Sequence, residues 1–235
     1  MTCARGEETD GGRASRHPLP SRSVVRETVQ DQVYRQLVAM ILDGEIEPGR
    51  TVTIAGIAEA FGVSAMPVRE ALHRLTAAKV LTVIAARSVG VPPLTVERLS
   101  DLTRVRAEVE GLAAAWAARN VTAATLARLD ALVAQISGHL ADDDPTAYVP
   151  ANRAFHFAIY EAAGSEALLA LIESLWLQIG PYLGLLRGSG NWRTANRQHQ
   201  AVRDALARRD GTAARAAVRA DIEEAAEILD RLLRG

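Results

Sequence analysis

Residues 41–83 read ILDGEIEPGRTVTIAGIAEAFGVSAMPVREALHRLTAAKVLTV, and this stretch decides the fold of the N-terminal part of the chain. Thr53 can cap a short helix, and Gly62 supplies a residue that lets the backbone reverse at the end of that helix. Ser64 can cap the next helix, in which Pro67 falls in the first turn, where a backbone donor has no intrahelical partner. The pattern predicts two short helices joined by a tight glycine turn.

The second of these helices has two faces of different character. Its inward stripe is apolar and consists of Val68, Leu72 and Leu75. Its outward face presents Met66, Arg69 and His73, at spacings of three and four residues. Two short β-type stretches follow at residues 80–84 and 89–91, and they predict a hairpin.

Two helices and a hairpin of this kind predict a winged helix-turn-helix, which lays its second helix in the major groove and its hairpin tip beside a phosphate backbone. We expect Arg69 to read guanine or to grip a phosphate. The candidate DNA-contacting residues are Ser64, Met66, Arg69, His73 and Arg87. The alternative is that Arg69 and His73 form a solvated helix face that pairs with Glu70 and other surface acids.

The same stretch resembles the DNA-binding domain of GntR-family regulators, through the turn ILxGxxxPG and the helix GVSxxPVREALxRL. The resemblance spans roughly residues 26–93, and Ser64 and Arg69 match its pattern. Many relatives carry arginine where this chain has Ala55 and Ala65, so those DNA contacts do not transfer. Ser88 stands where a wing glycine is common, and the operator sequence is left open.

Composition indicates a mostly helical protein of two domains. The chain has 235 residues, with 49% hydrophobic and only 4% aromatic residues, and is rich in Ala, Leu and Arg, which favours helices over sheets. We expect a disordered arm over residues 1–24, a winged helix-turn-helix over 25–93 and an all-helical effector domain over 94–235. The net charge of −1 means that any DNA binding depends on a local basic face.

Three features predict a cytoplasmic location. Cys3 is the single cysteine, so no internal disulfide can form and a reducing compartment is expected. The sequence shows no run that we expect to span a membrane, and its N-terminus lacks the apolar core of a secretory signal. We therefore expect no membrane partner.

The C-terminal part shows helical periodicity throughout, in segments at residues 96–118, 122–140, 146–163, 165–187, 191–209 and 212–233. Within these segments, a few polar residues fall on apolar stripes, where an unpaired polar group is costly. They are Arg106, Asn152, His156, His199 and Asp221. Such a set of helices predicts a bundle whose interior holds these side chains.

Four of these polar residues form a candidate metal site. Asn152 and His156 lie four residues apart on one helix face, and His199 and Asp221 arrive from two other helices. Nitrogen and oxygen donors of this kind suit a divalent zinc, nickel, iron or manganese ion with an open coordination position. The alternative is that both histidines are hydrogen-bonded core residues and that Asp221 pairs with an arginine.

The helical part resembles the ligand domain of the FadR-type branch, known as the FCD domain, through VRAEVEG, NRAFHFAIYEAAGS and RQHQAVRDALARRD. The resemblance implies a divalent metal held by an acid or amide, a histidine on the same helix and two later histidines. Asn152, His156 and His199 match those positions. The last position is Asp221 here, which leaves the metal identity open.

A metal ion with one anionic ligand, together with Arg106 as a carboxylate clamp, predicts a small organic acid as the effector. Arg106 can equally pair with Glu110. Trp176, Gln178 and Tyr182 are expected to line the same cavity, although core packing explains Trp176 equally well.

The sequence therefore predicts a transcription regulator, either repressor or activator, whose affinity for a double-stranded DNA operator changes when the acid binds. The resemblance and the two-fold logic of such operators imply a homodimer on a palindromic site. Two alternatives are a regulator that senses the metal itself and a non-heme iron enzyme, since two histidines and a carboxylate also describe such a centre. A catalyst has no need of a helix-turn-helix, which favours the regulator.

Overall fold

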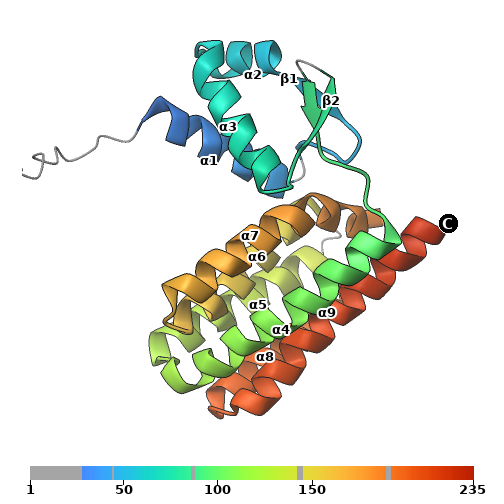
Figure 1. The fold of residues 1–235 in the computed structure, drawn as a ribbon. Helices are drawn as coiled ribbons and strands as arrows, with labels where there is room; N and C mark the ends of the chain where they lie inside the picture. Colours follow the sequence, from blue (N-terminus) through green and yellow to red (C-terminus); the bar gives the residue numbers. More distant parts are fainter. Residues whose placement is uncertain (1–27, 44, 86–87, 142–144, 189–191) are drawn as a thin grey trace, which may run out of the picture.

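The structure is a computed structural model, and it describes residues 28–235 apart from 44, 86–87, 142–144 and 189–191. The expected N-terminal arm at residues 1–24 and the candidate wing residue Arg87 lie outside the described residues. The described chain forms a small N-terminal unit of helices and strands above a larger helical bundle (Figure 1).

The N-terminal unit contains three helices and a small sheet. Its elements are α1 (Val29–Leu42), β1 (Thr51–Thr53), α2 (Ile54–Phe61), α3 (Ala65–Ala77), β2 (Thr82–Ala85) and β3 (Ser88–Gly90). The inward stripe of α3 is buried as predicted, and α3 packs against α1 and α2. This arrangement confirms the helix-turn-helix.

The sheet has three antiparallel strands in the order β1-β3-β2, one strand more than the predicted hairpin. The added strand is β1, in which Val52 lies opposite Val89 of β3. Gly90 allows this pairing, because a Cβ atom there would lie 2.6 Å from the Arg50 carbonyl oxygen. Three residues are too short a strand to leave a period-2 pattern, so the sequence did not predict it.

The helix-end features predicted from the sequence are present at two positions and absent at a third. The Thr53 hydroxyl accepts the Gly56 amide at 3.1 Å, and Gly62 adopts the left-handed conformation at φ 64°. Ser64 occupies the N-cap position of α3, but its side chain makes no capping hydrogen bond. The expected serine cap was therefore wrong in its chemistry, although the helix starts where predicted.

The C-terminal unit is the predicted all-helical bundle. Its elements are α4 (Val96–Asn120), α5 (Ala123–Ala141), α6 (Pro145–Ala162), α7 (Glu166–Leu183), a short 3-10 helix η1 (Gly184–Gly188), α8 (Trp192–Ala207) and α9 (Gly211–Arg234). The long helices α4 and α9 run side by side, α8 packs on α9, and α5 packs on α6 and α8 (Figure 1). The interior of this bundle holds the candidate site.

The segment Glu166–Leu186 is long and apolar enough to cross a membrane by length and composition alone. The expectation that the chain has no such run was therefore wrong as stated. In the structure this segment is a helix of the bundle, and α7 packs against α1, α4 and α6. Its apolar character is that of a helix with a buried face.

The two units contact each other directly. Helix α1 packs on α7, so closely that a Cβ atom at Gly180 would lie 2.5 Å from Leu42 Cδ2. The Tyr182 hydroxyl donates a hydrogen bond of 2.6 Å to the Pro92 carbonyl. An ion pair of 3.3 Å joins Arg153 of α6 to Asp43 at the end of α1. The bundle is thus connected to the helix that supports α3.

Candidate metal centre and nucleic-acid interface

The outward face of α3 is open to solvent. Ser64, Met66, Arg69 and His73 are all exposed, with 63% of Met66 accessible. In the described part of the chain no ion pair joins Arg69 to Glu70, which was the alternative role for this arginine. Arg74 instead points inward to α1, where it pairs with Asp31 at 3.1 Å and lies 3.8 Å above the Tyr34 ring. The face that would meet DNA is free, and the helix is anchored from behind.

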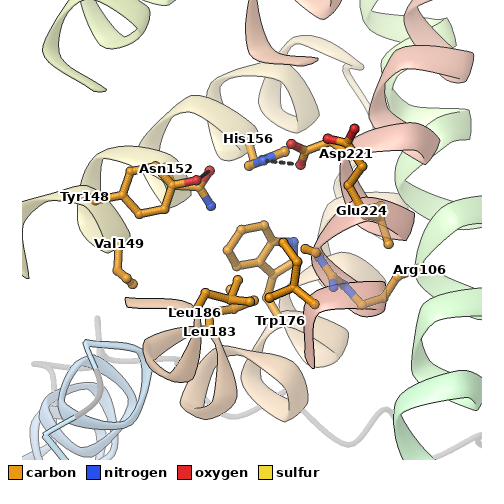
Figure 2. A pocket seen from close by; sticks show the side chains of 13 residues that line it. Arg106, Tyr148, Val149, Asn152, His156, Trp176, Leu183, Leu186, Asp221 and Glu224 are labelled. Atoms are coloured by element: carbon orange, nitrogen blue, oxygen red, sulfur yellow. Dashed lines mark hydrogen bonds and ion pairs between the residues drawn. The ribbon is translucent and has the colours of Figure 1, made fainter. Parts of the chain in front are cut away.

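Three residues with metal-binding side chains converge inside the bundle. His156 comes from α6, His199 from α8 and Asp221 from α9, and their ligand-type atoms lie within 4.8 Å of one another. The Nε2 atom of His156 is 3.2 Å from Asp221 Oδ2, and that of His199 is 3.7 Å from Asp221 Oδ1. Figure 2 shows His156 and Asp221 facing each other across the top of a cavity.

His199 is fully buried, and neither of its ring nitrogens has a hydrogen-bond partner among the described residues. Burial lowers the pKa of His199 to about 4, so the ring is neutral at neutral pH and keeps a lone pair. A buried polar ring without partners is costly unless something else satisfies it. The alternative of an ordinary hydrogen-bonded core histidine therefore does not fit His199.

Asp221 remains ionised beside the two histidines. Burial works against its charge, but the hydrogen bond that His156 donates and the positive charge of Arg106 hold the pKa of Asp221 below its usual value. Two imidazoles and one carboxylate are a donor set that fits a divalent first-row metal ion.

Asn152 lies one helical turn before His156 on α6, and it lines the same cavity. The Tyr148 hydroxyl approaches Asn152 Oδ1 at 3.4 Å. Both side chains project toward the cavity in Figure 2. All four predicted metal-site residues are thus brought to one place.

The cavity beneath these residues is small, with a volume of about 50 Å³. Its walls are mainly apolar, and its lining includes Val149, Leu183, Leu186, Ile222, Ala225 and Ile228. Arg106 and Trp176 form part of the wall (Figure 2). The space suits a small ligand with a short apolar part.

Arg106 makes the ion pair that was the alternative to its role as a carboxylate clamp, and the clamp stays a prediction. Its Nε donates to Glu110 Oε1 at 2.7 Å, so the alternative pairing with Glu110 is present. It also lines the cavity. Gln178 and Tyr182 do not, because Gln178 donates to the Ser174 carbonyl and Tyr182 to Pro92, and neither is among the lining residues.

Two family models match this chain. One is described as "Bacterial regulatory proteins, gntR family" and covers residues 29–91, and the other is the FCD domain and covers residues 101–224. The chain belongs to the GntR family, in the branch that carries an FCD domain. This regulator is similar to the HTH-type transcriptional regulator McbR of Escherichia coli K12, with 34% identity over 155 residues that cover 66% of this chain and 70% of McbR.

Two further comparisons extend over more of the chain. The regulator BphR of Paraburkholderia xenovorans LB400 is 28% identical over 227 residues, which cover 92% of this chain and 90% of BphR. The solved structure of E. coli McbR/YncC has a TM-score of 0.82 and 28% identity, and the match covers 88% of this chain and 99% of that one. These relatives are regulators and not enzymes, so this GntR-family protein is a DNA-binding transcriptional regulator. The iron-enzyme alternative is set aside.

Several residues in or next to the cavity of this GntR-family regulator were not predicted as site residues. Tyr148 and Tyr160 flank Asn152 and His156 at further steps of four residues on α6, and this spacing could have revealed them. Glu224 lies three residues after Asp221 on α9 and also lines the cavity, where its Oε2 atom is buried without a partner among the described residues. Glu110 was considered only as a partner of Arg106.

Proposed function

We propose that this GntR-family regulator changes its operator affinity when a small organic acid binds beside a divalent metal ion in the FCD domain. The observation that carries the proposal is the buried His199 ring beside His156 and Asp221, because neither of its nitrogens has a hydrogen-bond partner within the described part of the chain. A neutral imidazole in that setting is a ready metal ligand. Zinc, nickel, iron and manganese all suit this donor set.

The proposed metal ligands are His156, His199 and Asp221, with Asn152 as a further oxygen donor from the cavity wall. A bound divalent ion would supply positive charge and a Lewis-acid position for a carboxylate. One carboxylate ligand, Asp221, does not neutralise a divalent ion. Glu110 offsets the charge of Arg106, and Arg197 lies 3.7 Å from the Glu224 carboxylate, so the remaining positive charge at the metal favours an anionic ligand.

The remaining walls indicate the shape of the acid. Val149, Leu183 and Leu186 offer apolar contact. Glu224 offers its Oε2 atom as an acceptor for a hydroxyl group, while its Oε1 atom lies 3.7 Å from Arg197. With about 50 Å³ of space, a short-chain hydroxy or keto acid fits better than a sugar acid. An ion alone would not need this apolar space, which favours an organic effector over a purely metal-sensing regulator.

On the DNA side, we propose that Arg69 reads a base edge in the major groove, with Met66 and His73 beside it and Ser64 at the positive end of α3 near a phosphate. The exposure of all four side chains supports this role. Arg87 is proposed as the wing contact from its place in the sequence between the two β-type stretches of the hairpin. We place the protein in the cytoplasm, where its DNA operator lies.

A homodimer on a palindromic operator is also proposed. The supporting surface is an apolar row on α4, called here the α4 stripe, which consists of Val105, Val109, Leu112 and Trp116. Val105 and Trp116 are 43% and 37% exposed, and Leu171 of the adjacent α7 is 59% exposed. Large exposed apolar side chains in such a row are typical of a surface that a second subunit covers.

The connection between cavity and operator is proposed to run through α6 and α7. Helix α6 carries His156 and also Arg153, which pairs with Asp43 at the end of α1. Helix α7 carries Trp176, which lines the cavity and also lines the groove between α1 and the bundle. A ligand that binds better to one arrangement of these helices would shift operator affinity by the same free energy.

The test begins with the metal. Purified full-length protein is expected to contain about one divalent ion per chain by elemental analysis, whereas His199→Ala loses it and His139→Ala, outside the cavity, retains it. Metal-free wild type that takes up no zinc, nickel, iron or manganese ion in a titration would overturn the metal proposal.

The second part tests the effector. An operator fragment is first selected by the protein from random duplex DNA, and its affinity is then measured with lactate, pyruvate and acetate against their neutral amides. Acids are expected to shift operator affinity in wild type and not in Arg106→Gln. Equal effects of acids and amides would contradict the proposal, and a shift caused by metal ions alone would favour the metal-sensing alternative.

A further inference from the structure

A single buried carboxylate lies between His156, a proposed metal ligand, and Arg106, which is proposed to bind the organic acid. Glu110 of α4 is completely inaccessible to solvent. It accepts hydrogen bonds from Arg106 Nε at 2.7 Å, from Trp176 Nε1 at 3.0 Å and from the Tyr160 hydroxyl. The donors come from three helices, α4, α7 and α6. Such saturation is what allows a charged carboxylate to be buried.

The hydrogen bond that Tyr160 donates to Glu110 decides the role of the Tyr160 oxygen toward His156. Arginine and tryptophan nitrogens can only donate, so Glu110 acts as the acceptor. Tyr160 has one hydroxyl proton, and Glu110 receives it. The Tyr160 oxygen also lies 3.1 Å from His156 Nδ1, and it can only accept there. His156 therefore carries a proton on Nδ1. Its Nε2 atom faces Asp221 at 3.2 Å, where a bound metal ion would replace the proton that Nε2 donates to the carboxylate.

We infer that Glu110 and Tyr160 are positioning residues: they hold His156 with Nδ1 protonated and Nε2 presented to the centre, while Glu110 keeps Arg106 and Trp176 on the cavity wall. The presentation of Nε2 as a ligand rests on the proposed function, whereas the proton on Nδ1 rests on the hydrogen bonds alone. Metal-binding histidines generally donate their second ring N–H to a fixed acceptor, which sets the tautomer and orients the ring.

The same carboxylate fixes Arg106 and Trp176, which line the part of the cavity where the organic acid is proposed to bind. Arg106 has its Nε turned to Glu110, and its guanidinium carbon lies 5.4 Å from the centre of the Trp176 ring. Both residues line the cavity, whereas Glu110, which holds them in place, does not. A change at Glu110 is thus expected to weaken metal and acid binding together, whereas a change at Tyr160 acts on the metal side alone.

The first measurement needs no metal. Long-range nitrogen–proton NMR spectra of the metal-free full chain report which ring nitrogen of each histidine carries a proton, and His156→Gln assigns the signal. We expect a protonated Nδ1 for His156 in wild type and loss of this preference in Tyr160→Phe. An unprotonated Nδ1 in wild type overturns the inference, even if Tyr160→Phe does not fold.

The second measurement is a calorimetric titration with zinc ion alone. Tyr160→Phe is expected to bind zinc about 10- to 100-fold more weakly than wild type. Tyr182→Phe is the matched control, because it removes the hydroxyl of an equally buried tyrosine, one that bonds to Pro92 and not to the site, and its affinity should remain within a few-fold of wild type. Equal zinc affinity in Tyr160→Phe and wild type overturns the inference.

A third variant distinguishes the effect on metal binding from the effect on acid binding. Glu110→Gln preserves the size of the side chain, and we expect it to weaken both zinc binding and the effect of lactate, whereas Tyr160→Phe loaded with zinc keeps the lactate response. If wild type binds no zinc, the proposed metal site fails, and the NMR result then decides the proton assignment separately.

Discussion

Arg69 is the residue whose side chain most directly tests how α3 meets DNA. It lies on the exposed face of a helix whose opposite face is buried against α1 and α2. Arg69→Ala is expected to weaken specific operator binding by about 1–3 kcal/mol, the cost of losing a contact to a base edge. Gel-shift titrations at one fixed salt concentration would measure it.

Arg104→Ala is the matched control for that measurement, because Arg104 is an exposed arginine on α4 that pairs with Asp101, away from α3. It should bind the operator as wild type does. If Arg69→Ala and Arg104→Ala give the same affinity, Arg69 does not contact a base.

The buried pair of Arg106 and Glu110 makes a second prediction at this scale. Arg106→Met leaves a charged Glu110 in the core without its cation, so we expect the free energy of unfolding to fall by about 3–5 kcal/mol. Urea denaturation followed by circular dichroism would show it. Arg104→Met removes an exposed pair and should cost no more than about 1 kcal/mol. A similar small loss for Arg106→Met would mean that Glu110 does not depend on the arginine.

At the scale of elements, the turn between α2 and α3 depends on the backbone of Gly62. Its φ of 64° is one that residues with a Cβ atom rarely adopt, although nothing lies within 4 Å of an added Cβ. Gly62→Ala is therefore expected to lower stability by about 1 kcal/mol or more through backbone strain alone. Thermal unfolding of the full chain would measure the shift.

Gly138 provides the opposite case on α5. It lies inside a helix, has an ordinary φ, and also has open space where a Cβ would be placed. Gly138→Ala should raise stability by up to about 1 kcal/mol, because alanine loses less backbone entropy in a helix. Changes of the same sign at both glycines would show that backbone conformation is not the cause.

At the scale of the whole molecule, the α4 stripe makes a prediction about the oligomeric state. Trp116→Glu places a charge at one end of the α4 stripe, in place of its largest side chain, so we expect the dimer dissociation constant to rise at least roughly tenfold, which corresponds to about 1.4 kcal/mol. Light scattering over a dilution series would detect the shift toward monomer, and operator affinity should fall with it.

Leu232→Glu is the control for assembly. Leu232 is 47% exposed near the end of α9 and is not part of the α4 stripe. Its variant should remain as dimeric as wild type. A Trp116→Glu protein that assembles as wild type does would place the subunit contact elsewhere.

The sequence by itself determined the features that depend on neighbours within a few residues. The cap at Thr53, the left-handed Gly62 and the apolar period of each helix act over three or four residues, so they are readable from the chain. The same period identified His156 and His199 as polar residues on buried faces. The helices α4 to α9 begin and end within a few residues of their predicted bounds for this reason.

The tertiary structure decided which side chains meet across elements. The pairing of β1 with β3 joins residues almost 40 positions apart, and Glu110 receives donors from α6 and α7, whose distance depends on how the helices pack. Tyr182 turned toward Pro92 instead of the cavity because α7 contacts the N-terminal unit. Periodicity tells which residues face inward, but the packing of the helices against one another selects the partner that each of them finds there.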